Sequence, residues 1–387
     1  MATHNQEMTL ECEVAVVGGG VMGFSAAHYL AEYGRDTVLM DQFPLPHTRG
    51  SSGGHTRITR LANYGDPALT SIMKDSFDRW LQMEHQSGVN LFRPAPLLTV
   101  GSMSSESTGN VLDNVMTSIH ASGSTPEVLD VGTANQRFRT SFPDNYKAVV
   151  DPSAGVLMAD KCLKTLQSLF LNNGGRVLDG WPVTSVTPGE TVELRGPKGR
   201  VKAKAAVLCP GPWAGPLLGS LGVQIPVRAE KIGVYYWKVR DPKTPVFTFI
   251  DLSCSDNHFY ALPDFEYPGY MKLCYHVGLR TDPDERDKVD MSTVQRRTED
   301  YVKKFFPCLE PKPSVVESCM YTITPDNNFV LDRHPKYQNL VFGAGFSGTG
   351  YKIAPACGEA LAKMALGLQP QLDFSSFTLG RFYRSKM

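Results

Sequence analysis

Short apolar runs and glycine-rich turns alternate at the start of the chain. Residues 13–17 form an apolar, β-branched run that predicts a buried strand. Residues 21–33 follow the pattern of a helix closed by Gly34, and residues 37–40 form a second apolar run that ends on Asp41. This order of elements is typical of a Rossmann-like unit.

The same order of strand, glycine-rich turn and helix is predicted near the C-terminus. Residues 340–342 predict a short strand, and a turn follows it that contains Gly343, Gly345, Gly348 and Gly350. An amphipathic helix comes next, with apolar residues at 353, 357, 361, 364 and 365. The turn would place a second helix N-terminus and Lys352 near the ligand of the first unit. The alternative is a tight turn with a solvent-exposed lysine.

Composition and charge narrow the class of protein. A chain of 387 residues with 42% hydrophobic content can form two domains or one large one. Lysine plus arginine (39) balances aspartate plus glutamate (39), so nothing attracts nucleic acid or an anionic membrane. The most apolar window, 205–227, is broken by prolines, which argues against a membrane span. We expect an enzyme acting on a small molecule.

The eight cysteines lie at positions 12, 162, 209, 254, 274, 308, 319 and 357. No C-x-x-C pair occurs, so a zinc ribbon or a thioredoxin-type motif is not expected, and we predict no metal site. The polar N-terminus lacks the pattern of a secretory signal, which favours a reducing, intracellular location without structural disulfides. Locally, each cysteine, including Cys319 in the stretch ESCMYT, is best interpreted as a buried apolar residue.

The first turn carries the clearest chemical motif. Gly18, Gly20 and Gly23 form G-x-G-x-x-G between the predicted strand and helix, and Asp41 lies 23 residues after the first glycine. Glycines let the backbone approach a pyrophosphate, and an acid at this distance can bind a ribose hydroxyl. The predicted dinucleotide contacts here are Gly18, Gly20, Val21, Met22, Gly23 and Asp41.

The pattern by itself does not distinguish FAD from NAD. However, residues 44–60, PLPHTRGSSGGHTRITR, form a long, polar, basic loop where an NAD-binding domain would continue with a crossover helix. This loop favours an extended cofactor such as FAD.

Five stretches together resemble one family: VVGGGVMG, PHTRGSSGGHTRITR, AAVLCPGPWAGPLL, YPGYMKLCYHVG and ESCMYT…LDRHP…GAGFSGTGYK. They are similar to the monomeric sarcosine oxidase and L-pipecolate oxidase family of FAD-dependent amine oxidases, over residues 13 to about 380. ESCMYT and LDRHPKY are nearest to the L-pipecolate oxidase (peroxisomal sarcosine oxidase) branch. The resemblance implies an α/β fold, with a Rossmann-like FAD-binding domain and a second, mostly antiparallel-sheet substrate domain, as in D-amino-acid oxidase.

This fold predicts how the chain is divided. We assign residues 11–90, 151–220 and 325–380 to the FAD-binding domain, and residues 91–150 and 221–324 to the substrate domain. The substrate segments are rich in Tyr, Phe, Val and Pro and lack long helical periodicity, which favours an antiparallel sheet. Residues 381–387 form a C-terminal tail.

The resemblance also implies roles for residues around the flavin ring. Cys319 matches the cysteine that forms a thioether to the 8-alpha carbon of the flavin. Thr56 and Arg57 match positions beside the ring, where a guanidinium would stabilise negative charge. Lys272 matches the lysine that helps the reduced flavin pass electrons to oxygen. Further cofactor contacts are assigned to Ser51, Val183, Gly345, Gly348 and Lys352.

Substrate residues transfer in the same way. Arg60 and Lys352 match the pair that holds the substrate carboxylate, and Tyr260 and His276 match residues that line the cavity. In strand alternation Lys272 and His276 share one face; from the pattern alone that face is more often solvated. Thr349 stands where close relatives carry histidine, and Ser52 and Gly53 stand where bacterial enzymes carry two histidines.

The implied reaction is oxidation of a secondary amino acid, such as sarcosine or L-pipecolate, by O2, giving an imine and hydrogen peroxide. The amine reacts as the neutral base, so activity should rise toward alkaline pH. The segment LANYGDP (61–67) resembles fungal enzymes that act on bulkier N-substituted amino acids. A saccharopine-type or fructosyl-amino-acid-type substrate therefore stays open, as does a primary amino acid.

The last three residues, 385–387, resemble the S-K-L peroxisomal address with methionine at the end. We predict a peroxisomal monomer bound by the import receptor; a frayed tail on a cytoplasmic protein is the alternative. Two rival classes share the glycine motif: a NAD-dependent dehydrogenase and a flavin-binding protein without catalysis. The cations Arg60, Lys272 and Lys352 argue against the second.

Overall fold

The computed structural model describes residues 8–61, 67–104, 106–253, 258–263, 265 and 267–383. Residues 62–66 of LANYGDP and the C-terminal tripeptide 385–387 lie outside these residues. The chain divides into two compact units. Unit 1 holds residues 1–53, 162–229 and 320–387, and unit 2 holds residues 54–161 and 230–319.

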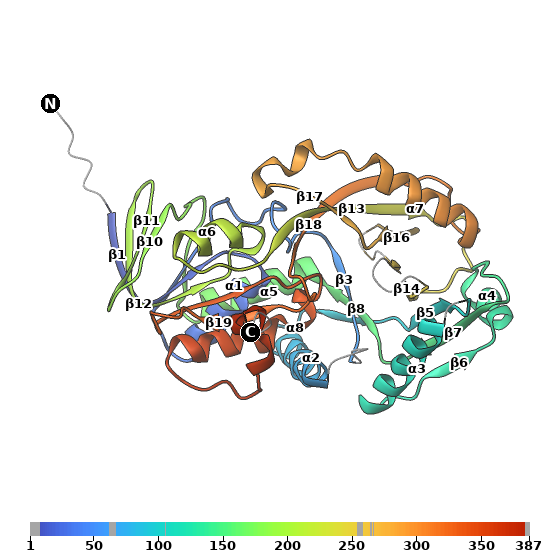
Figure 1. Cartoon of the computed structure of the whole chain (residues 1–387), viewed down its shortest axis with the longest axis horizontal. Coiled ribbons are helices and arrows are strands. Elements are labelled where there is room, and N and C mark those ends of the chain that lie inside the picture. Colours follow the sequence, from blue (N-terminus) through green and yellow to red (C-terminus); the bar gives the residue numbers. More distant parts are fainter. Residues whose placement is uncertain are drawn as a thin grey trace. The chain divides into compact units, whose positions relative to one another are not determined.

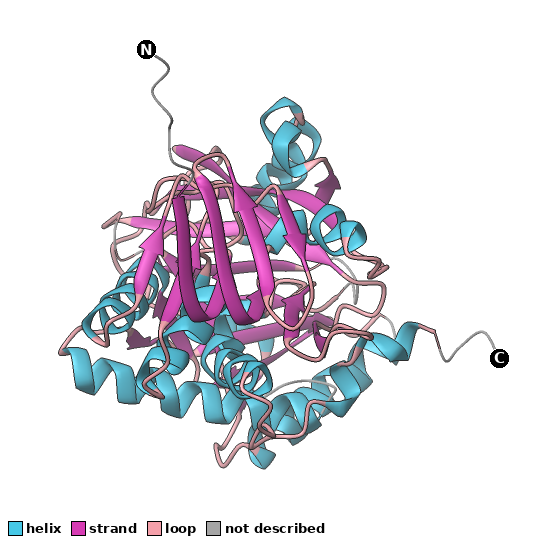
Figure 2. Cartoon of the chain, turned by 90° about the vertical axis from the view of Figure 1, so that its left-hand side faces the viewer, coloured by secondary structure: helices cyan, strands magenta, loops and turns pink. Residues whose placement is uncertain are grey.

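Unit 1 is built on an eight-stranded sheet in the order β10-β11-β12-β1-β2-β9, with β20 paired to β12 and β19 to β20. Strands β1, β2, β9, β12 and β20 run parallel, whereas β10, β11 and β19 pair antiparallel. Figure 2 shows the long strands of this sheet side by side. The strands are β1 (Met8–Val17), β2 (Thr37–Met40), β9 (Arg176–Leu178), β10 (Ser185–Thr187), β11 (Val192–Gly196), β12 (Gly199–Leu208), β19 (Val330–Arg333) and β20 (Leu340–Ala344).

The predicted N-terminal elements are confirmed. Helix α1 (Val21–Glu32) ends before Gly34, which has a φ of 70°, and β2 has the predicted bounds. Strand β1 begins earlier than predicted, because its first residues pair with β12 from Met8 opposite Gly199. Helix α8 (Gly350–Ala365) follows β20 as predicted and packs on α1 and on the parallel strands (Figure 1). Helices α1 and α8 pack closely, since a Cβ added at Gly358 of α8 would lie 2.3 Å from Cβ of Ser25 in α1.

Shorter helices complete unit 1. They are α6 (Ala214–Ser220) and the 3-10 turns η1 (Gly211–Trp213), η3 (Ser375–Phe377) and η4 (Leu379–Phe382). Two elements begin in unit 2 and end in unit 1, namely α5 (Ala159–Asn172) and β18 (Val315–Ile323).

Unit 2 contains a nine-stranded sheet in the order β17-β13-β16-β15-β14-β5-β7-β6, with β18 beside β13. Along this path every pair is antiparallel except β14 and β5, which confirms the mostly antiparallel prediction. The strands are β5 (Leu97–Ser102), β6 (Glu127–Leu129), β7 (Tyr146–Asp151), β13 (Arg228–Lys238), β14 (Thr248–Asp251), β15 (Phe259–Pro263), β16 (Tyr270–Tyr275) and β17 (Gly278–Arg280). A small sheet of β3 (Thr56–Thr59), β8 (Gly155–Met158) and β4 (Phe92–Pro94) completes the strands.

Long helices in unit 2 contradict the expectation that its segments lack helical periodicity. Helix α7 (Ser292–Phe305) buries one face, made of Val294, Thr298, Tyr301, Val302 and Phe305. These residues have helical spacing, but charged residues between them make the pattern hard to recognise in the sequence. The helices of unit 2 are α2 (Pro67–Ser87), α3 (Glu106–Ala121), α4 (Val131–Phe138) and α7, with the 3-10 turn η2 (Pro283–Lys288).

The chain crosses between units at other points than predicted. Residues 54–90 and 151–161, assigned above to the FAD-binding domain, lie in unit 2. The reason is strand pairing: β3 and β4 both pair with β8, so these three segments stay together. The assignment of one unit to the cofactor and the other to the substrate stays a prediction.

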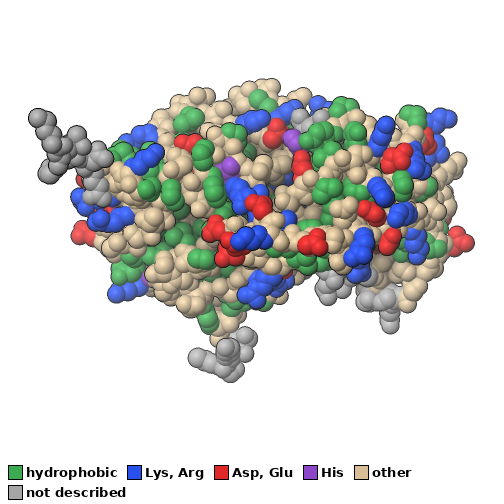
Figure 3. All heavy atoms as spheres, turned by 90° about the horizontal axis from the view of Figure 1, so that it is seen from above, with side chains coloured by type: hydrophobic (Ala, Val, Ile, Leu, Met, Phe, Trp, Pro, Cys, Tyr) green, Lys and Arg blue, Asp and Glu red, His purple; other side chains and the backbone are tan. Residues whose placement is uncertain are grey.

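Charges of both signs are mixed over the face shown in Figure 3. This agrees with the balanced composition and gives no large field of one sign on that face. Among the described residues, no helix combines the length and the apolar character needed to cross a bilayer.

One buried histidine predicts acid sensitivity. His28 is 2% exposed inside α1, and burial lowers the pKa of its imidazole from 6.5 to about 4. The unfolded chain binds this proton at higher pH than the folded chain does, so the stabilisation is fully present above about pH 6.5 and is lost as the pH falls toward 4. The loss should reach about 3 kcal/mol.

Urea unfolding of the wild type and of His28→Leu at several pH values between 4.5 and 7.5 measures this effect. The stability of the wild type should fall more steeply with acid than that of the variant. Parallel pH profiles for the two proteins would contradict the prediction.

Candidate active site

The parallel strands of unit 1 bring four loops to one edge of the sheet. Strands β1, β2, β12 and β20 all end there, because parallel strands share the direction of their carboxyl ends. From β1 the chain proceeds to β2 on one side, while β12 and β20 lie on the other side. Ligands of open α/β sheets bind outside the carboxyl ends at such a change of direction.

The glycine turn after β1 admits no side chain at two of its positions. Gly18 has a φ of 105°, and a Cβ there would lie 2.2 Å from the carbonyl oxygen of Cys209. A Cβ at Gly23 would lie 1.8 Å from the carbonyl oxygen of Gly18. Val21 and Met22, in the first turn of α1, are buried. These two positions therefore require glycine because the turn packs closely against neighbouring backbone. The contact of this turn with a pyrophosphate stays a prediction.

Ser52 is a site residue that sequence reasoning missed. Its Oγ accepts the N–H of Val21 at 2.9 Å, and its carbonyl oxygen accepts the hydroxyl of Tyr351 at 3.1 Å. The loop after β2 is thereby tied to the start of α1 and to α8. The serine stood out in the sequence only as a departure from a pair of histidines; its place in a glycine-rich loop was the available signal. The neighbouring Ser51 is half-buried, and its cofactor contact stays a prediction.

Asp41 directly follows β2, as predicted, and is buried. Its Oδ2 accepts the N–H of Gly19 at 2.6 Å, and its Oδ1 accepts the N–H of Phe43 at 2.8 Å. The same Oδ1 lies 3.1 Å from Nε2 of His47. The carboxylate therefore holds the glycine turn in place. Its contact with a ribose hydroxyl stays a prediction.

A serine also anchors the C-terminal glycine turn. Ser347 has a φ of 46° and is 8% exposed. Its N–H donates to the carbonyl oxygen of Thr322 at 3.0 Å, and its Oγ accepts the N–H of Thr324 at 3.2 Å. These bonds join the loop after β20 to the end of β18. Sequence reasoning marked the glycines of this turn and missed the serine that locks it.

Helix α8 begins beside this turn. Gly345 and Gly348 have positive φ angles of 68° and 83°. Thr349 precedes the helix, but its hydroxyl donates to the carbonyl oxygen of Phe346 at 2.8 Å instead of capping the helix. Lys352 lies half-buried in the first turn of α8.

Unit 2 brings together three residues that are far apart in the sequence. The carbonyl oxygen of Thr56 accepts Nη1 of Arg57 at 2.9 Å and Nζ of Lys272 at 3.3 Å. The Nη2 of Arg57 lies 4.0 Å from Sγ of Cys319. A guanidinium and an ammonium thus share one backbone carbonyl, and the guanidinium also reaches the thiol of Cys319. Such positive charge favours a ligand that carries or develops negative charge.

The side chain of Thr56 is a second sign that a ligand binds here. The residue is fully buried, and its Oγ1 has no hydrogen-bond partner among the described residues. A buried hydroxyl without a partner is costly, so a group absent from the protein chain is expected to complete it.

Lys272 does not lie on a solvated face. It is 4% exposed on β16, where it is opposite Tyr236 of β13 and Leu262 of β15. The prediction from the pattern alone, that this face of the strand is solvated, is therefore wrong for Lys272.

His276 follows directly after β16 and stacks on His258 with ring centroids 4.3 Å apart. Tyr260 lies with its ring 6.1 Å from that of His276, and it is opposite Cys274 across the β15–β16 pair. The ring of Tyr260 packs in the same apolar cluster as Cys319. Tyr260 thus packs in one cluster with Cys319, and His276 lies beside Tyr260.

Cys319 differs from most of the other described cysteines. All of them are free thiols; Cys162, Cys209, Cys274, Cys308 and Cys357 are buried, whereas Cys319 is half-buried. Burial raises the pKa of Cys209 to about 12 and also raises the pKa of Cys274 and Cys357. These buried thiols are unreactive at neutral pH. Cys319 is thus less buried than these thiols, although it packs against an apolar cluster, and its bond to the flavin stays a prediction.

Other predicted residues are not brought together within a unit. Arg60 follows β3 in unit 2, whereas Lys352 and Thr349 belong to unit 1, so their joint grip on a carboxylate stays a prediction. Val183 lies half-buried between β9 and β10 and packs against the core of the unit 1 sheet.

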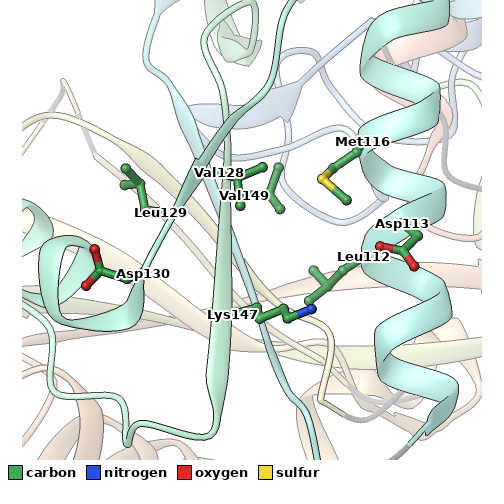
Figure 4. A pocket seen from close by; sticks show the side chains of 8 residues that line it. All are labelled: Leu112, Asp113, Met116, Val128, Leu129, Asp130, Lys147 and Val149. Atoms are coloured by element: carbon green, nitrogen blue, oxygen red, sulfur yellow. The ribbon is translucent and has the colours of Figure 1, made fainter.

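A pocket of about 300 Å³ lies at the other end of the unit 2 sheet (Figure 4). Its walls come from α3, β6, β7 and the start of α4, and include Leu112, Met116 and Val149. Lys147 extends from β7 toward α3 at its rim. None of the predicted site residues lines it. The pocket is therefore separate from the candidate site.

Comparison with known proteins decides the family. Residues 13–364 match the model of the DAO family, described as FAD dependent oxidoreductase. The peroxisomal sarcosine oxidase of Mus musculus is 37% identical over 382 residues, which is 96% of each chain. The chain belongs to the sarcosine oxidase family of FAD-dependent oxidoreductases. As a member, it is an FAD-dependent amino-acid oxidase.

A second relative agrees with this placement, and a solved structure agrees with the fold. The monomeric sarcosine oxidase of Bacillus sp. (strain NS-129) is 30% identical, over 97% of this chain and 98% of the relative. The solved structure of NikD, an unusual amino acid oxidase essential for nikkomycin biosynthesis, superposes with a TM-score of 0.85, at 20% identity over 95% of this chain and 97% of that chain. At that identity the likeness shows the fold, which is the predicted two-domain flavoprotein fold.

The residues of the chain fit the FAD of this family. The close glycine turn after β1 suits a pyrophosphate, and the unsatisfied hydroxyl of Thr56 suits a polar ring edge. The NAD-dependent dehydrogenase considered above is excluded by the family match.

Proposed function

We propose that this protein oxidises the C–N bond of a secondary amino acid, such as L-pipecolate or sarcosine, with O2 as acceptor and with FAD attached to Cys319. The observation that carries the proposal is the cluster in which Arg57 and Lys272 share the Thr56 carbonyl and Arg57 also reaches Cys319. FAD, when bound, accepts two electrons from the substrate and passes them to oxygen.

The cations of the cluster have distinct roles in this proposal. The substrate loses two electrons and two protons to give an imine, and O2 takes up two electrons and two protons to give hydrogen peroxide. Arg57, which reaches Cys319, stabilises negative charge while electrons leave the substrate. Lys272, buried beside Thr56, stabilises the negative charge that oxygen acquires.

Substrate recognition uses the remaining predicted residues. Arg60 and Lys352 hold the substrate carboxylate, and this fixes the C–N bond for reaction. Tyr260 and His276 line the substrate cavity, with Tyr260 in the same apolar cluster as Cys319. Thr349 is smaller than the histidine expected there, which removes a ring near the carboxylate end of the site and leaves the ring or chain on the substrate nitrogen open. This favours testing bulkier N-substituted and primary amino acids beside the simple ones.

We infer that the enzyme works in the peroxisome as a monomer. The curated relatives of Mus musculus and Homo sapiens are named peroxisomal, and the chain ends in Ser-Lys-Met. The name of the Bacillus relative supports the monomer. The import receptor would bind the C-terminal tripeptide.

Covalent attachment is tested by acid precipitation of the purified holoenzyme. Yellow colour should stay in the pellet of the wild type and move to the supernatant of Cys319→Ser, because the thioether cannot form with a hydroxyl. Cys12→Ser is the matched control, since Cys12 is also a half-buried free thiol. It should keep the colour in the pellet.

A peroxide assay with sarcosine, L-pipecolate, L-proline, glycine and D-alanine then names the substrate. The highest kcat/KM should belong to a secondary amino acid. Colour in the wild-type supernatant would remove the role of Cys319, and a preference for glycine or D-alanine would overturn the proposed substrate class.

A further inference from the structure

We propose that Tyr236 is a positioning residue for Lys272: its ring holds the ammonium where it serves the reaction with oxygen. This inference rests on the role given to Lys272 under Proposed function. Nothing in the site described so far uses Tyr236.

The two side chains are paired by the sheet. Tyr236 of β13 is directly opposite Lys272 of β16 in the antiparallel register, and the ammonium lies 5.8 Å from the centroid of the ring. Tyr236 is 0% exposed and Lys272 is 4% exposed. At this distance an ammonium is attracted to the π face of an aromatic ring, and the attraction grows when water is excluded.

The ring is itself held from two sides. Its hydroxyl donates to Oε2 of Glu317 at 3.4 Å, and Glu317 lies on β18, two residues before Cys319. The ring of Tyr267 meets that of Tyr236 edge-on with centroids 5.1 Å apart, and His55 meets Tyr267 in the same manner at 5.3 Å. A ring restrained in this way presents one fixed face to the lysine.

Burial makes such a partner necessary. An ammonium taken out of water loses hydration, and this disfavours the charged form unless other groups replace the water. Here the carbonyl oxygen of Thr56 supplies one partner, and the face of Tyr236 supplies another. Removal of the ring would let the ammonium move from Thr56 or lose its proton. In either case the charge near the reacting oxygen would be lost.

Rapid mixing separates this role from a structural one. The holoenzymes of wild type, Tyr236→Leu, Tyr236→Phe and Lys272→Met are reduced by substrate without oxygen and then mixed with oxygen. Tyr236→Leu should react with oxygen about tenfold more slowly, with an unchanged rate of reduction by substrate. Tyr236→Phe keeps the ring and should stay within about threefold of the wild type. Tyr270→Leu, a tyrosine of the same apolar cluster, is the control and should leave both rates unchanged.

Fluorinated phenylalanines at position 236 give a test that does not depend on the Leu variant folding. They keep the shape of the ring and weaken its π face stepwise, so the rate with oxygen should fall as fluorine atoms are added. A crystal structure of Tyr236→Leu supplies a readout other than activity: Nζ of Lys272 should no longer lie 3.3 Å from the Thr56 carbonyl oxygen.

The outcomes distinguish the two proposals. If Lys272→Met slows the reaction with oxygen while Tyr236→Leu and the fluorinated series do not, the role of Tyr236 is overturned and the proposed function stands. If Lys272→Met reacts with oxygen at the wild-type rate, the role of Lys272 falls, and the inference about Tyr236 falls with it.

Discussion

Replacement of Lys272 by methionine should slow the reaction of the reduced enzyme with oxygen by about two to three orders of magnitude. Methionine keeps most of the volume of the side chain and removes its charge. The ammonium is buried beside Thr56 and close to the guanidinium of Arg57, so no water replaces its effect on a developing negative charge. Stopped-flow measurement of kcat/KM for oxygen, beside the rate of reduction by substrate, checks the prediction.

Lys238→Met is the matched control, because Lys238 is an exposed lysine at the end of β13. It should leave both half-reactions unchanged. An equal loss in the two half-reactions of Lys272→Met would instead indicate a general disturbance of the site and would contradict the specific role in oxygen chemistry.

Replacement of Gly23 by alanine should abolish cofactor binding. The added Cβ would lie 1.8 Å from the carbonyl oxygen of Gly18, which belongs to the turn itself, so the backbone must move away from the position that the pyrophosphate requires. We expect a loss of folding free energy on the order of 3 kcal/mol from this overlap. The flavin-to-protein ratio of the purified variant should be near zero, and its urea midpoint should fall.

Gly219→Ala provides the comparison within the same unit. Gly219 lies in α6, and a Cβ there would meet no atom within 4 Å. Alanine is the better helix former, so this variant should be as stable as the wild type or slightly more so and should carry the same amount of flavin. A Gly23→Ala protein with normal flavin content would show that the turn is not the pyrophosphate site.

Two serines and a tyrosine–glutamate pair extend the candidate site beyond its family motifs. Ser52 and Ser347 fix the two glycine-rich loops of unit 1 by hydrogen bonds to neighbouring elements. In unit 2 the pair Tyr236 and Glu317 restrains the wall behind Lys272. Each of these residues acts through another side chain or loop, which is why no local pattern pointed to it.

The sequence pattern was sufficient to predict the structure where the residues that form an element and the residues they contact lie in one segment. The strand, glycine turn and helix between residues 8 and 32 form one continuous unit, and Gly18 and Gly23 contact atoms of that unit or of the adjacent strand end. The composition of the segments 91–150 and 221–324, rich in Tyr, Phe, Val and Pro, likewise predicted the antiparallel sheet of unit 2. Helices α3 and α7 were not predicted: the apolar residues of α7 alternate with charged ones, and those of α3 alternate with Ser, Thr, Asn and Gly. The predicted domain bounds differ from the two compact units at residues 54–90 and 151–161, because the pairing of β3 and β4 with β8 leaves no local trace in the sequence.

The sequence by itself determined the fold class, the dinucleotide turn and, through the resemblance of its motifs, the family. Tertiary structure decided which side chains meet. Thr56 and Lys272 are 216 positions apart and Arg57 and Cys319 are 262 apart, yet each pair is in contact in the same cluster. The register between β13 and β16 places Tyr236 opposite Lys272. Lys272, which the sequence pattern suggested was solvated, is buried in the candidate site. Contacts of this range depend on how sheets pair and pack, and the order of residues along the chain does not encode that pairing locally.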